Sequence, residues 1–346
     1  MEDSLNDRHV AILAHEQFPE RAKTALGILR YANYDVAAVL DRNRPADRVN
    51  DLVPDVQDAP IVSGMSDLEP DAADALVIGI APIGGGFDDS WREDVLTALE
   101  RGWDVISGLH YFLEQDEEFR TLADEHGCEL WDVRKPHDDL TVSRGIANEV
   151  DAEIILTVGT DCSVGKMTVS MELTRRAVDA GYDAAIIPTG QTGIMIEGWG
   201  NPVDRVISDF TAGSVEEMIL EIGDDHDYLF VEGQGSIIHP AYSGVTCGIL
   251  HGAMADKLIL CHAAGREAVH GYESVPLPPI STYVDLYEDL AEPIHPATVC
   301  AGALNTFHVD DDEEARRAIE EFEGELAAPA TDPIRFGAEH LLEVVL

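Results

Sequence analysis

One segment of the chain combines glycine, lysine and a strand-to-helix transition in the way that phosphate-binding loops do. An apolar, β-branched run at 154–158 leads into Gly159, a short polar stretch, then Gly165 and Lys166, and a helical pattern continues from near 164 to 180. Glycines permit turns that aim backbone N–H groups at a phosphate, and the helix N-terminus and the lysine add positive charge. We therefore predict a phosphorylated ligand at Gly159, Thr160, Asp161, Cys162, Ser163, Val164, Gly165, Lys166, Met167 and Thr168.

The spacing departs from the usual loop in two ways. Five residues separate Gly159 from Gly165, where the common pattern has about four. Met167 follows Lys166, at a position where serine or threonine usually binds magnesium, and Thr168 lies one residue further on. The alternative, a plain turn between a strand and a helix, explains less of the pattern.

A second signal is an apolar strand that ends in an acid. Residues 228–231 run into Glu232, which a parallel sheet would place beside the loop, on a metal or as a base. Gln234 lies between two glycines and Ser236 follows the second of them, and both are candidates for substrate contacts. His239 precedes a proline and is either a base, a contact for a cofactor ring, or a structural histidine. The alternative for Glu232 is an acid at an ordinary strand end.

Three further residues are candidates for binding a substrate carboxylate. Gln191 and Thr192 lie between glycines after a predicted strand at 183–188, which suggests backbone close to a ligand. Arg205 is a candidate anion contact, with a surface ion pair as the default interpretation. A long loop without function is the alternative for this stretch.

The first half of the chain alternates predicted strands and helices, which favours a parallel sheet. We expect strands at 9–14, 35–41, 75–80, 104–108 and 128–133, and helices at 20–32, 90–101 and 115–126. Ligands collect at the carboxyl ends of such strands, where the sequence carries His15, Asp41, His110 and glycines 84–86. These glycines do not form a dinucleotide motif, so positive φ angles are the preferred explanation, and the histidines are secondary candidates.

The second half repeats the alternation. We expect strands at 183–188, 228–232, 257–262 and 297–305, helices at 213–222, 281–291 and 311–326, and a turn at 330–337. The polar, proline-containing stretch 138–150 is the predicted boundary between domains covering 1–140 and 150–346.

Composition restricts the class of protein. The 346 residues contain 22 Lys+Arg against 67 Asp+Glu, a formal charge of −45, with the acids spread along the chain. Such a surface fits the cytoplasm of a halophile, where salt screens the self-repulsion.

We expect no nucleic-acid partner and no membrane span, because neither a basic stripe nor a long apolar run exists. The acidic start is not a signal peptide, and the five separated cysteines favour neither a disulfide framework nor a zinc ribbon. No metal is expected, and we expect a homo-oligomer.

The loop at 159–166 resembles that of dethiobiotin synthetase, which also has five residues between the glycines. With the segments 188–193 and 231–236 and the domain order, the chain resembles a two-domain family that includes D-glutamate N-acetyltransferases. This resemblance covers nearly the whole chain. It implies an α/β protein with an N-terminal Rossmann-like parallel-sheet domain and a C-terminal P-loop NTPase-like domain, and acetyl transfer to a small amino-acid substrate.

Three hypotheses follow from these patterns. In the first, the loop holds acetyl-CoA, Lys166 holds its pyrophosphate or an oxyanion, and Glu232 or His239 takes the proton of the D-glutamate amine. In the second, the loop holds ATP, Mg²⁺ binds Asp161 and Glu232, and a carboxylate is activated. In the third, the protein binds a nucleotide or coenzyme A without chemistry.

Overall fold

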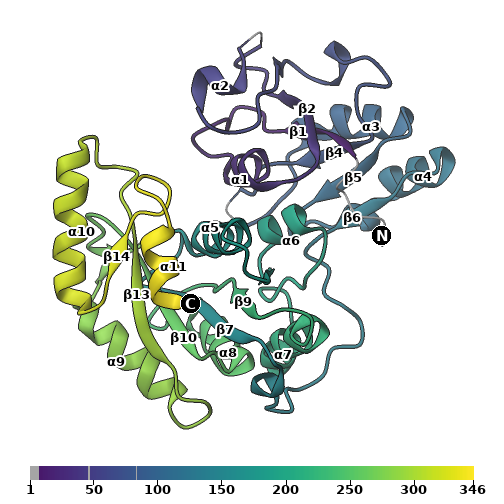
Figure 1. Cartoon of the computed structure of the whole chain (residues 1–346). Coiled ribbons are helices and arrows are strands. Elements are labelled where there is room, and N and C mark those ends of the chain that lie inside the picture. The colour runs from purple at the N-terminus through teal and green to yellow at the C-terminus, as the bar shows by residue number, and fades with distance from the viewer. Residues whose placement is uncertain (1–7, 46, 83) are drawn as a thin grey trace. The chain divides into compact units, whose positions relative to one another are not determined.

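The computed structural model describes residues 8–45, 47–82 and 84–346, and these residues form two compact units. The first unit comprises the chain up to Pro136 together with Gln191–Pro202. The second comprises His137–Gly190 and Val203–Leu346. Each unit contains a six-stranded sheet in which all strand pairs are parallel, as the sequence predicts (Figure 1).

The strand order of the first unit is that of a Rossmann-like fold. Its strands lie in the order β3-β2-β1-β4-β5-β6, so that the order reverses at β1. The strands are β1 (His9–Leu13), β2 (Asp35–Leu40), β3 (Ile61–Val62), β4 (Ala75–Ile78), β5 (Asp104–Ser107) and β6 (Leu130–Asp132). Residues 10–13 of β1 are fully buried, as a central strand covered on both faces requires.

The helices of the first unit follow the three predicted positions, with two additions, α2 and α6. They are α1 (Lys23–Tyr31), α2 (Val49–Leu52), α3 (Arg92–Glu100), α4 (Glu117–His126) and α6 (Gln191–Glu197). Helix α4 begins where the Asp116 carboxylate accepts hydrogen bonds from the N–H groups of Glu118 and Phe119, and ends at Gly127, with φ 71°.

Helix α6 corrects the sequence analysis, which assigned Gln191 and Thr192 to a loop. The helix is seven residues long and contains a glycine and three β-branched residues, so its intrinsic propensity is low. Packing stabilises it instead. Residues 192–196 are all buried, α6 contacts α1, and the Tyr34 hydroxyl donates a hydrogen bond to the Met195 carbonyl at 3.1 Å.

The second unit places the predicted phosphate loop at the centre of its sheet. The strands lie in the order β14-β13-β10-β7-β9-β8. They are β7 (Glu153–Gly159), β8 (Ala184–Ile187), β9 (Tyr228–Val231), β10 (Lys257–Ala263), β13 (Thr298–Asn305) and β14 (Ala330–Thr331). In the register of β7 with β9, Leu156 lies opposite Val231, so the loop after β7 and Glu232 after β9 leave the same edge of the sheet.

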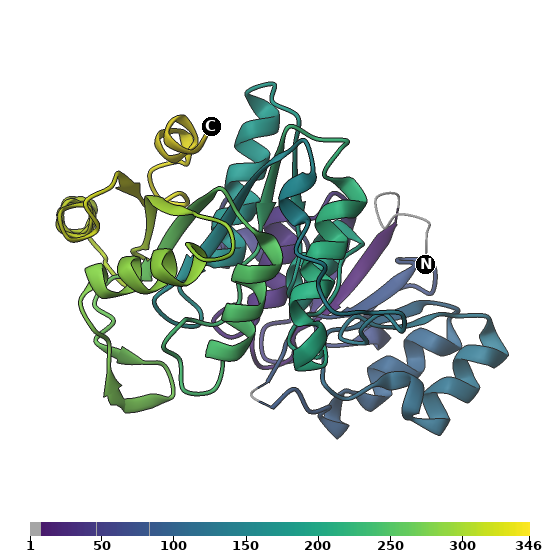
Figure 2. The same cartoon turned by 90° about the horizontal axis from the view of Figure 1, so that it is seen from below.

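Helices cover this sheet. They are α5 (Lys166–Asp179), α7 (Thr211–Ile222), α8 (Ser243–Ala253), α9 (Ile280–Ala291), α10 (Asp312–Leu326) and α11 (Glu339–Val345). One apolar core joins α5 and α11 to the strands, through residues such as Leu173, Leu341 and Phe230. A small hairpin of β11 (Ala268–Val269) and β12 (Tyr272–Pro276) projects from the rest of the unit (Figure 2).

Helices α8 and α11 and the hairpin were not expected from the sequence, and α5 begins at Lys166, two residues later than the predicted start near Val164. Helix α8 carries glycines at every fourth position, a composition unfavourable to an isolated helix. The glycines instead allow close packing on α7. A Cβ atom at Gly252 would lie 2.4 Å from the Ala212 carbonyl oxygen, and one at Gly248 would lie 2.7 Å from Thr211 Cγ2.

Among residues 8–45, 47–82 and 84–346, no helix has both the length and the apolar character needed to cross a bilayer.

Candidate functional site

The loop between β7 and α5 turns sharply at two residues with positive φ. Ser163 has φ 55° and Gly165 has φ 108°, and such left-handed residues within a turn direct N–H groups into a concave anion site. Gly159 has a different role, because its lack of a side chain lets Lys166 and Val164 pack closely against the backbone. A Cβ atom there would lie 2.9 Å from Lys166 Nζ and 3.0 Å from Val164 Cγ2.

Lys166 folds back across this loop from the first residue of α5. Its ammonium donates a hydrogen bond to the Asp161 carbonyl at 2.9 Å, and the residue is buried. Met167, the next residue, is buried, whereas Thr168 is half-buried. The position after the lysine therefore contributes to the core and offers no hydroxyl.

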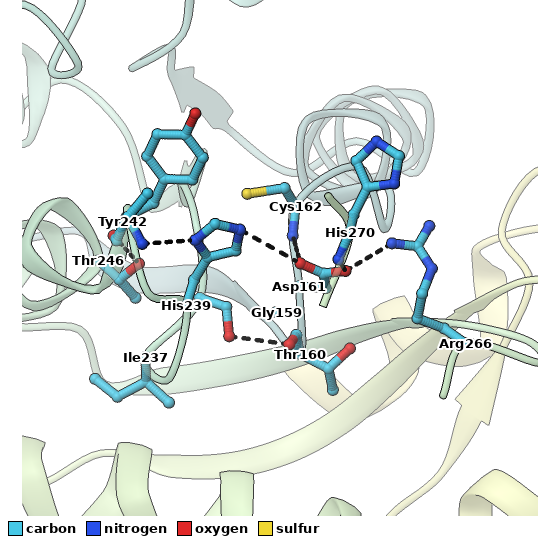
Figure 3. Close-up of polar contacts among 12 residues, drawn as sticks. Gly159, Thr160, Asp161, Cys162, Ile237, His239, Tyr242, Thr246, Arg266 and His270 are labelled. Carbon is cyan, nitrogen blue, oxygen red and sulfur yellow. Dashed lines mark hydrogen bonds and ion pairs between the residues drawn. The ribbon is translucent and has the colours of Figure 1, made fainter. Parts of the chain in front are cut away.

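Asp161 is fully buried and anchors the loop to the segment that follows β10. Its Oδ2 accepts hydrogen bonds from Arg266 Nη1 at 2.6 Å and from the His270 N–H at 2.7 Å. Its Oδ1 accepts the N–H of Cys162 at 2.7 Å. Figure 3 shows these contacts converging on the carboxylate. Because the Asp161 carboxylate is fully buried, leaving it unpaired would be costly, and its hydrogen bonds therefore hold the loop in place.

His239 lies beside Asp161, and its imidazole is neutral. Its Nδ1 accepts the N–H of Ala241 at 3.1 Å, which assigns the ring proton to Nε2, and Nε2 faces Asp161 Oδ1 at 3.9 Å (Figure 3). Burial lowers the pKa of His239 below its usual 6.5, against an opposite effect of Asp161. The Tyr242 ring packs on the imidazole with the ring centroids 4.6 Å apart.

Asp161, Cys162 and His239 each place one metal-binding atom within 4.8 Å of the others. The surroundings do not fit a metal. A ligating histidine binds through a lone pair and donates its other N–H, whereas His239 receives an N–H at Nδ1 and carries its proton on Nε2. Arg266, already paired with Asp161, would also repel a cation.

Glu232 is buried, and its carboxylate connects the ends of β8 and β9. Oε2 accepts the N–H groups of Thr189 at 3.2 Å and Gly190 at 3.1 Å, and Oε1 accepts Gln234 Nε2 at 2.9 Å. Gln234, predicted to contact substrate, also donates to Thr189 Oγ1 at 3.2 Å. Both side chains therefore organise the two strand ends.

Ser236 supports the loop rather than facing outward, because its hydroxyl donates to the Thr160 carbonyl at 3.0 Å and it is fully buried. Two supporting residues had not been predicted. His262 Nδ1 contacts Thr160 Oγ1 at 2.8 Å, and the Tyr287 hydroxyl donates to the Gly159 carbonyl at 2.8 Å. His262 lies at a strand end, which could have marked it, but Tyr287 lies within a helix and carries no such signal.

The remaining predicted substrate residues belong to helix α6 and to the segment that follows it. Gln191 and Thr192 belong to the first unit, where the Thr192 hydroxyl bonds that of Thr24 at 2.9 Å. Arg205 is exposed in the second unit. Their contact with a substrate stays a prediction.

The secondary candidates of the first unit have structural partners. His15 Nε2 pairs with Asp94 Oδ2 at 2.9 Å, and Asp41 Oδ1 accepts the N–H of Glu16 at 3.0 Å. Gly84 and Gly85 have φ angles of 86° and 63°, as the sequence analysis preferred. The His110 N–H donates to the Gly85 carbonyl at 2.8 Å.

Two family models match the chain. Residues 42–136 match the "Rossmann-like domain" and residues 141–342 the "P-loop domain" of a family described as a domain of unknown function, DUF1611. The chain belongs to the DUF1611 family. A crystal structure of a DUF1611 protein from Anabaena variabilis superposes with a TM-score of 0.91 at 37% identity, covering 98% of this chain and 99% of that one.

Two curated relatives of this DUF1611 chain are named D-glutamate N-acetyltransferase. The protein from Tritonibacter scottomollicae is 38% identical over 79% of this chain and 81% of its own length. The protein from a Pseudoalteromonas species is 34% identical over 78% of this chain and 80% of its own length. The family resemblance expected from the loop motif is therefore confirmed.

Proposed function

We propose that the protein is an N-acetyltransferase that moves the acetyl group of acetyl-CoA to the amine of D-glutamate or a similar amino acid. The names of the two curated relatives support the reaction and the acceptor. The observation that carries the proposal within this chain is the loop itself. Lys166 closes it at the N-terminus of the long helix α5, which suits a pyrophosphate.

The alternative reaction uses ATP and Mg²⁺, and the geometry favours it less. Asp161 and Glu232, the two acids predicted to bind magnesium, already accept three N–H hydrogen bonds each. Met167 supplies no hydroxyl beside Lys166. A magnesium ion would have to displace these donors, whereas a pyrophosphate needs only the loop amides and the lysine charge.

In coenzyme A, the pyrophosphate and the reacting thioester lie at opposite ends of the pantetheine arm. This arm is about as long as four extended residues, roughly 14 Å. If the loop holds the pyrophosphate, an extended arm places the thioester well away from Lys166. His239 lies against loop residue Asp161, and a Cβ atom at Gly233, next to Glu232, would lie 3.4 Å from Lys166 Cδ. Phosphates held by the loop would therefore lie near both side chains, far from the thioester.

Because of this separation, we propose a positioning role for Glu232 and His239 in place of the general base considered from the sequence. In the transfer, the amine nitrogen attacks the acetyl carbon, the C–S bond breaks, and the leaving thiolate gains the proton that the amine loses. Glu232 already accepts N–H hydrogen bonds from Thr189, Gly190 and Gln234, and His239 already carries a proton on Nε2. Their bonds hold the loop and the ends of β8 and β9 in place.

Glu232→Gln tests this role. The amide oxygen can keep the two backbone N–H bonds, so we expect kcat to fall less than about tenfold with an unchanged pH profile. Loss of a general base would instead lower kcat by about 10²–10⁴ and remove the acidic limb of the profile. Glu221→Gln, the same change at an exposed position of α7, is the control.

The experiment for the function is thiol release from acetyl-CoA by the purified protein with D-glutamate. We expect the same rate in EDTA and in added Mg²⁺, together with N-acetylglutamate in the product mixture. A rate that EDTA abolishes would replace the proposal with the metal-dependent alternative.

A further inference from the structure

A cavity of about 380 Å³ lies in the second unit, at the carboxyl ends of β10 and β13, next to the phosphate loop. Its volume is in the range of small-molecule sites, roughly 300–1,000 Å³. Two of its lining residues bond loop residues directly. His262 contacts Thr160, and Arg266 contacts Asp161. These two side chains therefore connect the wall of the cavity to the loop.

One wall of the cavity contains a buried polar atom without a partner. Tyr283 has no exposed surface, and its hydroxyl has no hydrogen-bond partner among the residues that the structure describes. A buried hydroxyl left unpaired is costly, so native proteins usually satisfy it with a protein group, water or ligand. Because Tyr283 belongs to the lining, a molecule in the cavity is a candidate for that partner.

Arg266 links the cavity to the loop. Nη1 is bound to Asp161, whereas Nε and Nη2 have no hydrogen-bond partner among the described residues, and the side chain is 23% exposed. The guanidinium is a rigid fork with several donors. One edge is thus fixed on the loop while the other can bind a phosphate or sugar oxygen at the entrance to the cavity.

The rest of the lining combines apolar side chains with three acids, Glu267, Glu321 and Glu325. Phe322 stacks on His262 with the ring centroids 5.7 Å apart, and Pro279 belongs to the same lining. Burial lowers the pKa of His262 to about 4, so the ring is neutral. Glu321 and Glu325 offer acceptors and repel anions. These groups suit a neutral aromatic base that carries an amino group, and they disfavour a phosphate inside the cavity.

We propose that this cavity binds the adenosine of an adenosine diphosphate moiety whose phosphates occupy the loop. The inference rests on the phosphate role of the loop in the proposed function and adds the site for the nucleoside. Acetyl-CoA and ATP share this moiety. The adenine lies against Phe322 with its amino group toward the acids, and Arg266 and Tyr283 bind polar atoms of the nucleotide.

Calorimetric titration of the full chain with ADP, coenzyme A, ATP and inorganic pyrophosphate tests this site. Ala318 lines the cavity, and Ala318→Phe fills it. Glu320→Phe adds the same ring to an exposed position two residues on, which projects from a different side of α10. We expect Ala318→Phe to abolish measurable ADP binding, pyrophosphate affinity to stay unchanged, and Glu320→Phe to bind both as the wild type does.

Tyr283→Phe provides a second variant with opposite effects on binding and stability. We expect ADP affinity to fall about two- to tenfold, the scale of one hydrogen bond. The unfolding temperature without ligand should stay equal or rise, because an unpaired buried hydroxyl is removed.

Unchanged ADP binding in both cavity variants, with pyrophosphate still bound, overturns the nucleoside site alone. Failure of pyrophosphate to bind the wild type overturns the phosphate loop as well. If coenzyme A binds more tightly than ATP does, the adenosine in the cavity is that of coenzyme A.

Discussion

Lys166→Ala should weaken coenzyme A binding about ten- to hundredfold, because a charge-assisted hydrogen bond contributes about 1.5–3 kcal/mol. The ammonium is buried and donates a hydrogen bond to the Asp161 carbonyl across the loop. Added salt screens exposed charges far more than buried ones. The loss should therefore persist at the high salt that suits a chain of charge −45, and titration calorimetry measures it.

Two variants make this result specific. Lys166→Met keeps the apolar stem and removes only the charge, so it should lose nearly as much affinity while unfolding like the wild type. Lys23→Ala removes an exposed lysine from α1 of the first unit and should bind normally. Coenzyme A affinity that is equal in all three variants would exclude the loop as a phosphate site.

Gly233→Ala should strongly destabilise the second unit and abolish ligand binding. A Cβ atom at this position would lie 1.8 Å from the Thr157 carbonyl oxygen and 3.0 Å from its carbon. These are backbone atoms of β7 and cannot rotate aside, so β7 and the residues after β9 must separate. The separation would also break the Gly233 N–H bond to Thr157 Oγ1. We expect a loss of at least about 3 kcal/mol, the upper range for overpacking, measured by denaturant unfolding.

Gly244→Ala is the matched control. This glycine lies in α8 with no atom within 4 Å of an added Cβ, and alanine in a helix is favoured over glycine by about 0.5–1 kcal/mol. The control should equal or exceed the wild type in stability. A Gly233→Ala protein as stable as the control would show that β7 and β9 are not packed as described.

Local patterns were sufficient to predict the elements that carry the loop. The apolar run before Gly159 is β7, and the periodic stretch after Lys166 is α5. Helix α10 begins with three acids, as the helix dipole favours, and Asp311 caps it. These features depend on neighbours in sequence, which a single chain displays directly.

The partners of the site residues depend on tertiary contacts and could not be predicted in this way. Glu232 was identified as a carboxylate beside the loop, but its bonds to Thr189 and Gly190 come from the neighbouring strand end. Arg266 follows β10 directly, and only the fold shows that it reaches Asp161. Helix α6 forms through packing against α1, against its own propensity.

The most direct test of the account is a pair of assays on the same protein preparation at high salt. One measures thiol release from acetyl-CoA with D-glutamate or L-glutamate, and the other measures phosphate release from ATP with the same acids. The account predicts thiol release that requires the amino acid, is faster with the D-isomer and continues in EDTA, with no phosphate release above background. Phosphate release stimulated by a carboxylic acid, with acetyl-CoA inert, would contradict it.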